Sequence, residues 1–229
     1  MSLRAVVRIF FCSLFFVVLA GREPQAQAPA QSSSSSSKSK QSRKSSSRPD
    51  SPSDLGTVSN GVYRNAAFAF TCKIPAGWVL RTEELNVRDD ESAKSENNVE
   101  RSRVLLAAFS RPPEARAEDV NSSILIAAES SSSYPGLKDA AQYFGPVMEV
   151  AKAQGFEMDN DPYEFVLGTK KLARGDLQKN VGSRVMRQST LVVLARGYVL
   201  SFTFIGGTED DVEELVQGLS FGASARPAK

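Results

Sequence analysis

The residue types that most often do chemistry in proteins are scarce in this chain of 229 residues. It contains no histidine, so Ser-His-Asp and Cys-His catalytic groups and histidine-ligated zinc or haem sites cannot be built. Its two cysteines, Cys12 and Cys72, are too few for a thiolate metal cluster. The sequence therefore predicts no catalytic residue, no metal site and no bound cofactor.

Carboxylates are the remaining groups with catalytic potential. The sequence has two short acidic runs, Asp89-Asp90-Glu91 and Glu209-Asp210-Asp211. The first lacks the glycine-containing ligand spacing of calcium loops and is interpreted as part of an exposed loop or helix. The second begins a predicted helix, where acidic side chains suit the positive end of the helix dipole. A hydrolase with paired carboxylates stays open as an alternative function, because such pairs work at specific separations in space.

Basic residues are concentrated in one polar stretch, residues 31–53, which reads QSSSSSSKSKQSRKSSSRPDSPS. It carries one negative charge, at Asp50, and no leucine, isoleucine, valine or aromatic residue. Such a stretch buries too little apolar surface to offset its ordering entropy, which predicts a disordered linker. An alternative is that it contacts an anionic surface through its five basic residues, Lys38, Lys40, Arg43, Lys44 and Arg48.

Residues 1–30, which precede this linker, have the features of a secretory signal peptide. Arg4 and Arg8 give a positive start and precede Ile9–Ala20, a run of 12 residues without a charge. The run is too short to span a membrane, which takes about 20 apolar residues. We predict cleavage before Gln31 and export to the periplasm or the medium. An uncleaved segment that tethers the chain to the membrane is the alternative.

Residues 54–229 are enough for one globular domain. Three of the 28 basic residues lie in residues 1–30 and five in the linker, so the domain has 20, against 24 acidic residues. A mildly acidic domain therefore follows a basic linker. The formal charge of +2 for the whole chain gives no reason to expect nucleic-acid binding.

Strands are predicted in the first half of the domain by alternation and by apolar runs. Phe68–Ile74 alternates apolar and polar residues, which places Cys72 on a buried face where its thiol is inert. The turn Pro75–Trp78 ends this strand. The apolar runs Val104–Phe109 and Ser123–Ala128 indicate two central strands.

Helices are predicted twice. Apolar residues recur at helical spacing at Leu137, Ala141, Phe144, Met148 and Ala151. Gly145-Pro146 is expected to bend this helix and Gly155 to end it. Thr208 and Asp211 resemble a capping box before a second apolar stripe that runs from Val212 to Leu219.

The region between the two helices is predicted to be sheet. Tyr163–Leu167 alternates, and Leu172–Leu177 is a weaker candidate. Val185–Ala195 and Tyr198–Ile205 flank Arg196-Gly197, which predicts a hairpin with a two-residue turn.

Four motifs resemble the PsbP/Mog1-like superfamily over residues 61–222. They are Gly61-x-Tyr63-x-Asn65-x-x-Phe68-x-Phe70, Ile74-Pro75-x-Gly77-Trp78, Ser201-Phe202-Thr203-Phe204 and Leu219-Ser220-Phe221. The resemblance implies an α+β fold, an α/β/α sandwich around a mostly antiparallel sheet, and a role that is not enzymatic. It implies no functional residue for this chain. Together with the signal, it favours an exported binding or assembly protein whose partner is another envelope protein or complex.

Overall fold

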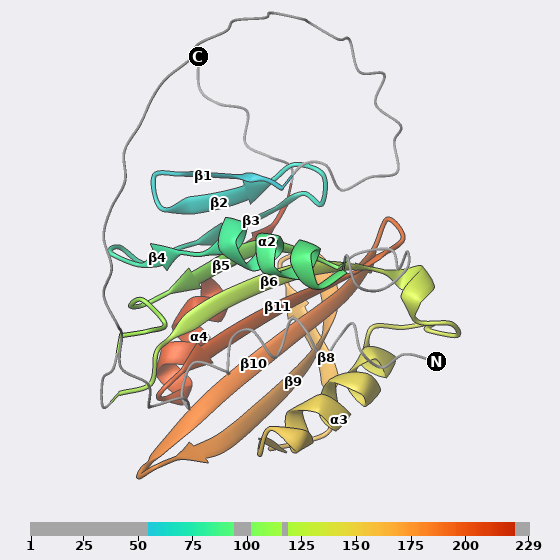
Figure 1. The fold of residues 1–229 in the computed structure, drawn as a ribbon. Coiled ribbons are helices and arrows are strands. Elements are labelled where there is room, and N and C mark those ends of the chain that lie inside the picture. The colour runs from blue at the N-terminus through green and yellow to red at the C-terminus, as the bar shows by residue number, and fades with distance from the viewer. Residues whose placement is uncertain (1–54, 94–101, 116–118, 223–229) are drawn as a thin grey trace, which may run out of the picture.

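The structure is a computed structural model that describes residues 55–93, 102–115 and 119–222 (Figure 1). The predicted signal peptide and linker lie outside the described residues, and so do the candidate contacts Lys38, Lys40, Arg43, Lys44 and Arg48. Within the described ranges, no helix has the length and apolar character needed to cross a membrane.

The described chain forms a large sheet, a small sheet and three α-helices. The large sheet has the strand order β4-β5-β6-β11-β10-β9-β7, and β8 also pairs with β9. Its strands are β4 (Val79–Leu80), β5 (Arg103–Phe109), β6 (Ser123–Ser130), β7 (Glu157–Met158), β8 (Tyr163–Leu167), β9 (Lys170–Val181), β10 (Arg184–Ala195) and β11 (Tyr198–Gly206). The small sheet has the order β1-β2-β3-β12. Its strands are β1 (Thr57–Ser59), β2 (Val62–Asn65), β3 (Phe70–Lys73) and β12 (Leu219–Phe221).

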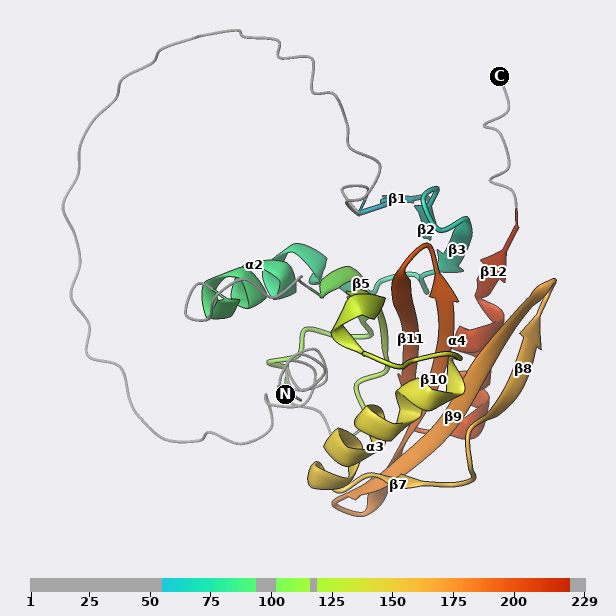
Figure 2. The same cartoon turned by 90° about the vertical axis from the view of Figure 1, so that its right-hand side faces the viewer.

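The helices cover both faces of the large sheet (Figures 1 and 2). They are α2 (Thr82–Ala93), α3 (Phe144–Ala153) and α4 (Glu209–Gln217), with 3-10 turns η2 (Ser131–Ser133) and η3 (Ala141–Tyr143). Helices α2 and α3 pack on one face, and α4 packs on the other together with the small sheet. Every strand pair is antiparallel. The α+β sandwich is thereby confirmed, and the outer layer beside α4 contains a small sheet that the sequence pattern does not predict.

The main core fills the space between the large sheet and the layer of α4 and the small sheet. Phe202 of β11 lies at its centre, with its ring centroid 5.0 Å from that of Phe70 and 5.6 Å from that of Phe221. Both pairs are edge to face, the arrangement that aromatic quadrupoles favour. Cys72 belongs to the same core, as the alternation predicts.

Two predicted boundaries are wrong, one of a strand and one of a helix. The strand expected over Phe68–Ile74 is β3, Phe70–Lys73, because residues 66–69 form a turn in which Ala69 has φ 53°. Phe68 stays buried because its backbone N–H donates to the Asn65 side chain, 2.9 Å away, which holds the turn against the core. Leu219, expected in the last helical stripe, lies in β12 and pairs with Cys72.

The predicted helix of residues 137–151 begins later than expected. Helix α3 starts at Phe144, after η3, so Pro146 lies in its first turn. The first four N–H groups of a helix have no partner within it, so proline is tolerated there without bending the helix. Gly155, with φ 81°, follows the helix end as predicted. The buried face consists of Phe144, Val147, Val150 and Ala151.

The long hairpin of β10 and β11 confirms the prediction for the sheet region. Arg196 and Gly197 both have positive φ, 53° and 79°, the combination that a two-residue hairpin turn of type I′ requires. Strand β9 runs from Lys170 to Val181, well beyond the predicted Leu172–Leu177. Within the predicted part, Arg174 and Asp176 lie on the face toward α4, where the candidate site begins.

Candidate functional site

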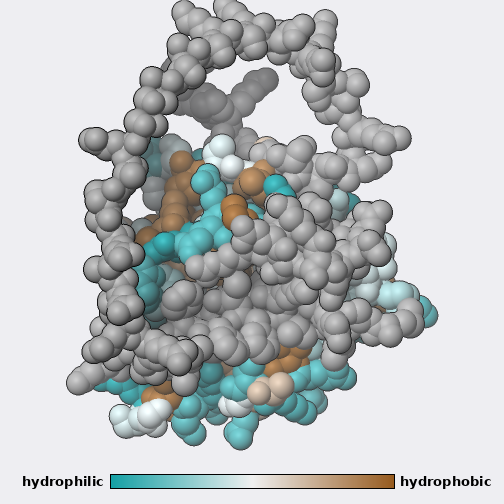
Figure 3. All heavy atoms as spheres, in the orientation of Figure 1, coloured by the Kyte–Doolittle hydropathy of each residue, from teal (hydrophilic) through white to brown (hydrophobic). Residues whose placement is uncertain are grey.

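The face of the large sheet that packs against α4 changes from apolar to polar along β9 and β10. Ser189 of β10 lies opposite Asp176 of β9, and Leu191 lies opposite Arg174. Leu191 is part of the main core, whereas Arg174 and Ser189 are buried polar residues. Hydrophilic side chains dominate the lower edge of the molecule in Figure 3, where the turn between β9 and β10 lies. The polar end of β9 and β10 is therefore the candidate site.

Arg174 is the centre of this polar cluster and is 9% exposed. Its Nε donates to Asp176 Oδ1, and its Nη2 donates to Glu213 Oε2 of α4, both at 2.9 Å. Nη2 also donates to Ser189 Oγ at 2.9 Å. Burial lowers the pKa of Arg174, but the hydrogen bonds to Glu213 and Asp176 outweigh it and raise that pKa. The guanidinium is thus fixed in position and stays charged.

Aromatic side chains of β8 complete the cluster. The Arg174 guanidinium lies over the Phe165 ring, 5.1 Å from its centroid, which is cation–π geometry. Tyr163 donates its hydroxyl to Asp176 Oδ2 at 2.9 Å, and Ser189 donates to the same carboxylate. Burial and the hydrogen bond to Asp176 raise the pKa of Tyr163 to about 12, so its hydroxyl stays protonated at neutral pH.

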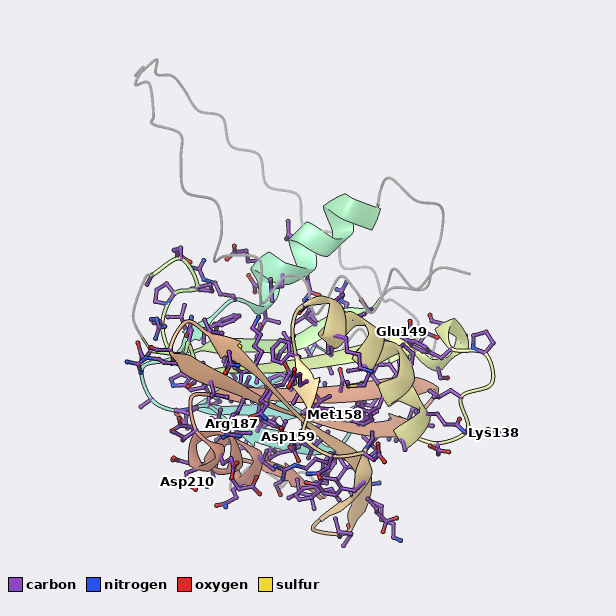
Figure 4. The ribbon with its side chains drawn as sticks, turned by 90° about the horizontal axis from the view of Figure 1, so that it is seen from below. Lys138, Glu149, Met158, Asp159, Arg187 and Asp210 are labelled. Carbon is purple, nitrogen blue, oxygen red and sulfur yellow. The ribbon has the colours of Figure 1, made fainter. Side chains whose placement is uncertain are left out.

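A groove of about 380 Å³ opens beside this cluster, between α4, the hairpin of β9 and β10, and the link after β7. Figure 4 shows Asp159, Arg187 and Asp210 grouped at this end of the molecule, each from a different element. The groove is lined by five carboxylates, those of Asp159, Asp176, Glu209, Asp210 and Glu213, and by the guanidinium groups of Arg174 and Arg187. Its lining is mostly charged.

The Arg187–Glu209 ion pair, with Nη1 and Oε1 3.1 Å apart, borders this groove. Both residues also line a second hollow of about 690 Å³, which continues past Thr208 toward Asp119. Burial raises the pKa of Asp159; Arg187 opposes that shift and the nearby carboxylates add to it. The two hollows together form an open polar surface at the N-terminal end of α4.

A second polar cluster lies on the opposite face of the large sheet. Glu129 of β6 is 3% exposed, and its carboxylate accepts hydrogen bonds from the hydroxyls of Tyr134 and Tyr143. The two rings meet edge to face, with centroids 5.2 Å apart. Among the described residues, no lysine or arginine pairs with this carboxylate. Burial raises the pKa of Glu129, although the tyrosine hydrogen bonds act against the shift.

The residues singled out in the sequence fall into separate places. Cys72 is fully buried, which confirms the predicted burial, and burial raises the pKa of its thiol to about 12, as expected for an unreactive thiol. The triplet Asp89-Asp90-Glu91 lies in α2, which confirms the helical alternative. The capping box is also confirmed: Thr208 Oγ1 accepts from the Asp211 N–H at 3.1 Å, and Asp211 Oδ2 accepts from the Thr208 N–H at 3.0 Å.

Sequence reasoning missed the groove itself. It explained Glu209 and Asp210 by the helix dipole alone, yet both also line the groove. It did not single out Arg174 or Asp176. The available signal was Arg174-Gly175-Asp176, an ion pair at the i and i+2 positions that share one face of a strand. Within the described residues, no group of three or more histidine, cysteine, aspartate or glutamate side chains could hold a metal ion.

Comparison with known proteins gives a likeness of fold. No family model and no curated protein matches the chain. Similar solved structures include the cyanobacterial PsbP of Synechocystis, with 15% identity over 73% of this chain and 99% of that chain, and TM-score 0.43. The Ran-binding protein Mog1p of Saccharomyces cerevisiae has 13% identity over 72% and 96%, and TM-score 0.39. LpqN of Mycobacterium tuberculosis, involved in cell envelope biogenesis, has 15% identity over 66% and 82%, and TM-score 0.34.

These names agree with the PsbP/Mog1-like resemblance of the sequence motifs. At such identities the likeness concerns the fold alone.

Proposed function

We propose that the protein is an exported, non-catalytic binding or assembly protein of the cell envelope, and that its partner is another envelope protein or complex. The proposal for export depends on the signal-like residues 1–30. The proposal for binding depends on the groove beside α4.

The character of the groove is the observation that carries the proposal. Pockets for small substrates are concave and mostly apolar, with a few polar groups. This groove is open and lined mainly by charged side chains, and Arg174 is already held by Asp176 and Glu213. Tyr163 is 42% exposed and donates a hydrogen bond to Asp176, which lines the groove, so Tyr163 lies at the edge of the groove. Tyrosine and arginine are enriched where protein interfaces derive most of their binding energy.

Photo-crosslinking in the native host tests the binding role. A benzoylphenylalanine at position 163 should give one discrete adduct with an envelope protein. The matched control is position 58, because Val58 of β1 is exposed to nearly the same degree, 43%, and belongs to the small sheet. Adducts of equal yield at both positions, or no adduct at position 163, would contradict the proposal.

Fractionation with intact-mass measurement tests the proposed location. A soluble envelope species that begins near Gln31 is the expected result. A full-length species in the membrane fraction would mean that residues 1–30 tether the domain. A full-length species in the cytosol would contradict export.

One observation favours a second candidate, a carboxylate-dependent hydrolase. Asp159, whose pKa is raised mainly by burial, shares the groove with Asp176, which is ion-paired with Arg174. Acid–base hydrolysis uses two carboxyl groups whose environments push their pKa values apart, and burial raises the pKa of Asp159. Turnover of a glycoside or ester that is abolished by Asp159→Asn and kept in Glu149→Gln would favour the hydrolase over the binding protein.

The alternative role of the basic residues Lys38, Lys40, Arg43, Lys44 and Arg48 on an anionic surface stays a prediction. Contacts by five cations should weaken steeply with ionic strength. Binding to an anionic polymer that is unchanged after deletion of residues 31–53 would exclude it.

A further inference from the structure

The groove beside α4 has more negative charge than its own residues neutralise. It holds five carboxylates and two guanidinium groups, which leaves three negative charges in excess. Arg174 is ion-paired with Asp176 and Glu213, and Arg187 with Glu209. Among the described residues, no basic side chain forms an ion pair with the remaining two carboxylates, Asp159 and Asp210.

These two carboxylates come from different parts of the fold. Asp159 follows β7, and its backbone N–H donates to the Asp176 carbonyl at 3.0 Å, which fixes the link beside β9. Asp210 lies in the first turn of α4. The dipole of α4 gives a local reason for an acid at position 210, but it gives none for an acid at position 159. The convergence of both on one groove suits a ligand that presents several positive charges.

The shape of the groove restricts that ligand further. It is open and continues past the Arg187–Glu209 pair into the second hollow. An extended polypeptide with lysine and arginine side chains fits such an elongated acidic surface better than a compact cation does. The aromatic rings of Tyr163 and Phe165 beside Arg174 and Asp176 already provide cation–π and hydrogen-bond contacts to charged groups.

We propose that the occupant of this groove is the chain's own basic segment, residues 38–48. The segment carries five positive charges and no negative charge, so its charge complements that of the groove. Lys38 is 17 residues before Leu55, where the described chain begins, and that length of chain reaches up to about 56–61 Å. A domain of this size has a radius of gyration of about 15 Å, so Lys38, at the start of the segment, can reach any part of its surface. Arg48 is 7 residues before Leu55 and reaches about 23–25 Å.

Covalent connection strengthens this contact. A tethered ligand has an effective concentration on the order of millimolar, so weak ion pairs are enough to keep the groove occupied. A partner with a basic segment would have to displace residues 38–48 before it could bind. The proposal does not depend on the proposed function, because the segment can occupy the groove whether or not an envelope partner exists.

Carbodiimide crosslinking of the purified full chain tests the proposal, since it joins a lysine amine to a carboxylate in direct contact. Lys38, Lys40 and Lys44 should crosslink within one chain to Glu209 and Glu213, at a yield independent of protein concentration. The double variant Asp159→Asn/Asp210→Asn keeps both target residues and removes two contacts. It should lower this yield about tenfold, since each exposed ion pair contributes severalfold to binding.

The matched control is Glu149→Gln, which removes an exposed acid of α3 away from the groove (Figure 4) and should leave the yield unchanged. Sodium chloride at 0.5 M should abolish the crosslinks, because it screens exposed charges. Three results would overturn the proposal. They are crosslinks of equal yield to Glu149 and Glu209, crosslinks found only between two chains, and no crosslink from residues 38–48 to the groove.

Discussion

The two polar clusters of the large sheet satisfy buried oxygen atoms in opposite ways. On the face with α3, the Glu129 carboxylate is held by two neutral hydroxyl groups, those of Tyr134 and Tyr143. On the face with α4, the carboxylates of Asp176 and Glu213 are held by the charged guanidinium of Arg174. The first cluster is closed, with Glu129 3% exposed, whereas the second borders an open groove.

The difference follows from what burial does to charge. A carboxylate without a cation is costly to bury, so its pKa rises and it tends to keep its proton. A carboxylate paired with arginine stays charged, but the pair is retained only where further hydrogen bonds support it. The Glu129 cluster therefore holds the segment between β6 and α3, which carries Tyr134 and Tyr143, against the sheet. The Arg174 cluster keeps charged groups fixed at a surface where a ligand can reach their neighbours.

The largest expected effect is that of Arg174→Ala. The substitution leaves Asp176 and Glu213 without their cation, and it removes the hydrogen bond to Ser189. Removing one partner of a buried ion pair leaves the other charge uncompensated and costs several kcal/mol. We therefore expect the free energy of unfolding to fall by about 3 kcal/mol. Urea unfolding measures it. A loss below about 1 kcal/mol would mean that the cluster behaves as an ordinary surface ion pair.

The Glu129 cluster should be less sensitive to loss of one partner. Tyr143→Phe removes one of two donors from a buried carboxyl group, which costs about 1–3 kcal/mol. Tyr134→Phe is the matched control, because its ring is only partly buried and solvent can replace its hydroxyl. The urea midpoint should therefore fall further for Tyr143→Phe. Equal losses would show that the two hydroxyls are equally well shielded from water.

The two clusters should also differ in their response to pH. The pKa of Glu129 is raised in the folded chain by burial, so the folded state binds its proton more tightly than the unfolded state. Stability should fall as pH rises above about 4.3, the ordinary value for glutamate, and continue to fall until the raised pKa is passed.

Each unit of that shift is worth about 1.4 kcal/mol. Glu129→Gln carries no titrating proton and should flatten the pH profile of the urea midpoint in this range. An unchanged slope in Glu129→Gln would mean that another group is responsible.

Much of the fold follows from local patterns in the sequence. The apolar runs of β5 and β6, the Arg196-Gly197 turn and the Thr208–Asp211 capping box act over a few residues, so their sequence signatures predict them. The register of β12 against β3 is not local, because it joins residues about 150 positions apart in the sequence, such as Leu219 and Cys72. This explains why Leu219 fitted a helical stripe on spacing alone.

The candidate site was harder to predict for a similar reason. Arg174 and Asp176 follow Leu172 on the same face of the strand, so the apolar alternation stops there, which made β9 look weak between Leu172 and Leu177. Gly175 adds to this effect, because glycine is poor in strands. The structure explains the glycine: a Cβ there would come within 2.4 Å of the Phe144 ring of α3. The polar face thus depends on packing between β9 and two helices that are distant in sequence.

The smallest expected effect on stability is that of Arg187→Ala, which tests whether the groove can be changed without disturbing the Arg174 cluster. Arg187 pairs with Glu209, whose side chain is 80% exposed, and such a pair contributes about 0–1 kcal/mol. Arg187→Ala should therefore change the urea midpoint little, in contrast to Arg174→Ala. It should also make the groove more negative and increase the crosslinking of residues 38–48 to Glu213. A large loss of stability would show that Arg187 belongs to the buried cluster, and weaker crosslinking would show that it holds the groove open for its ligand.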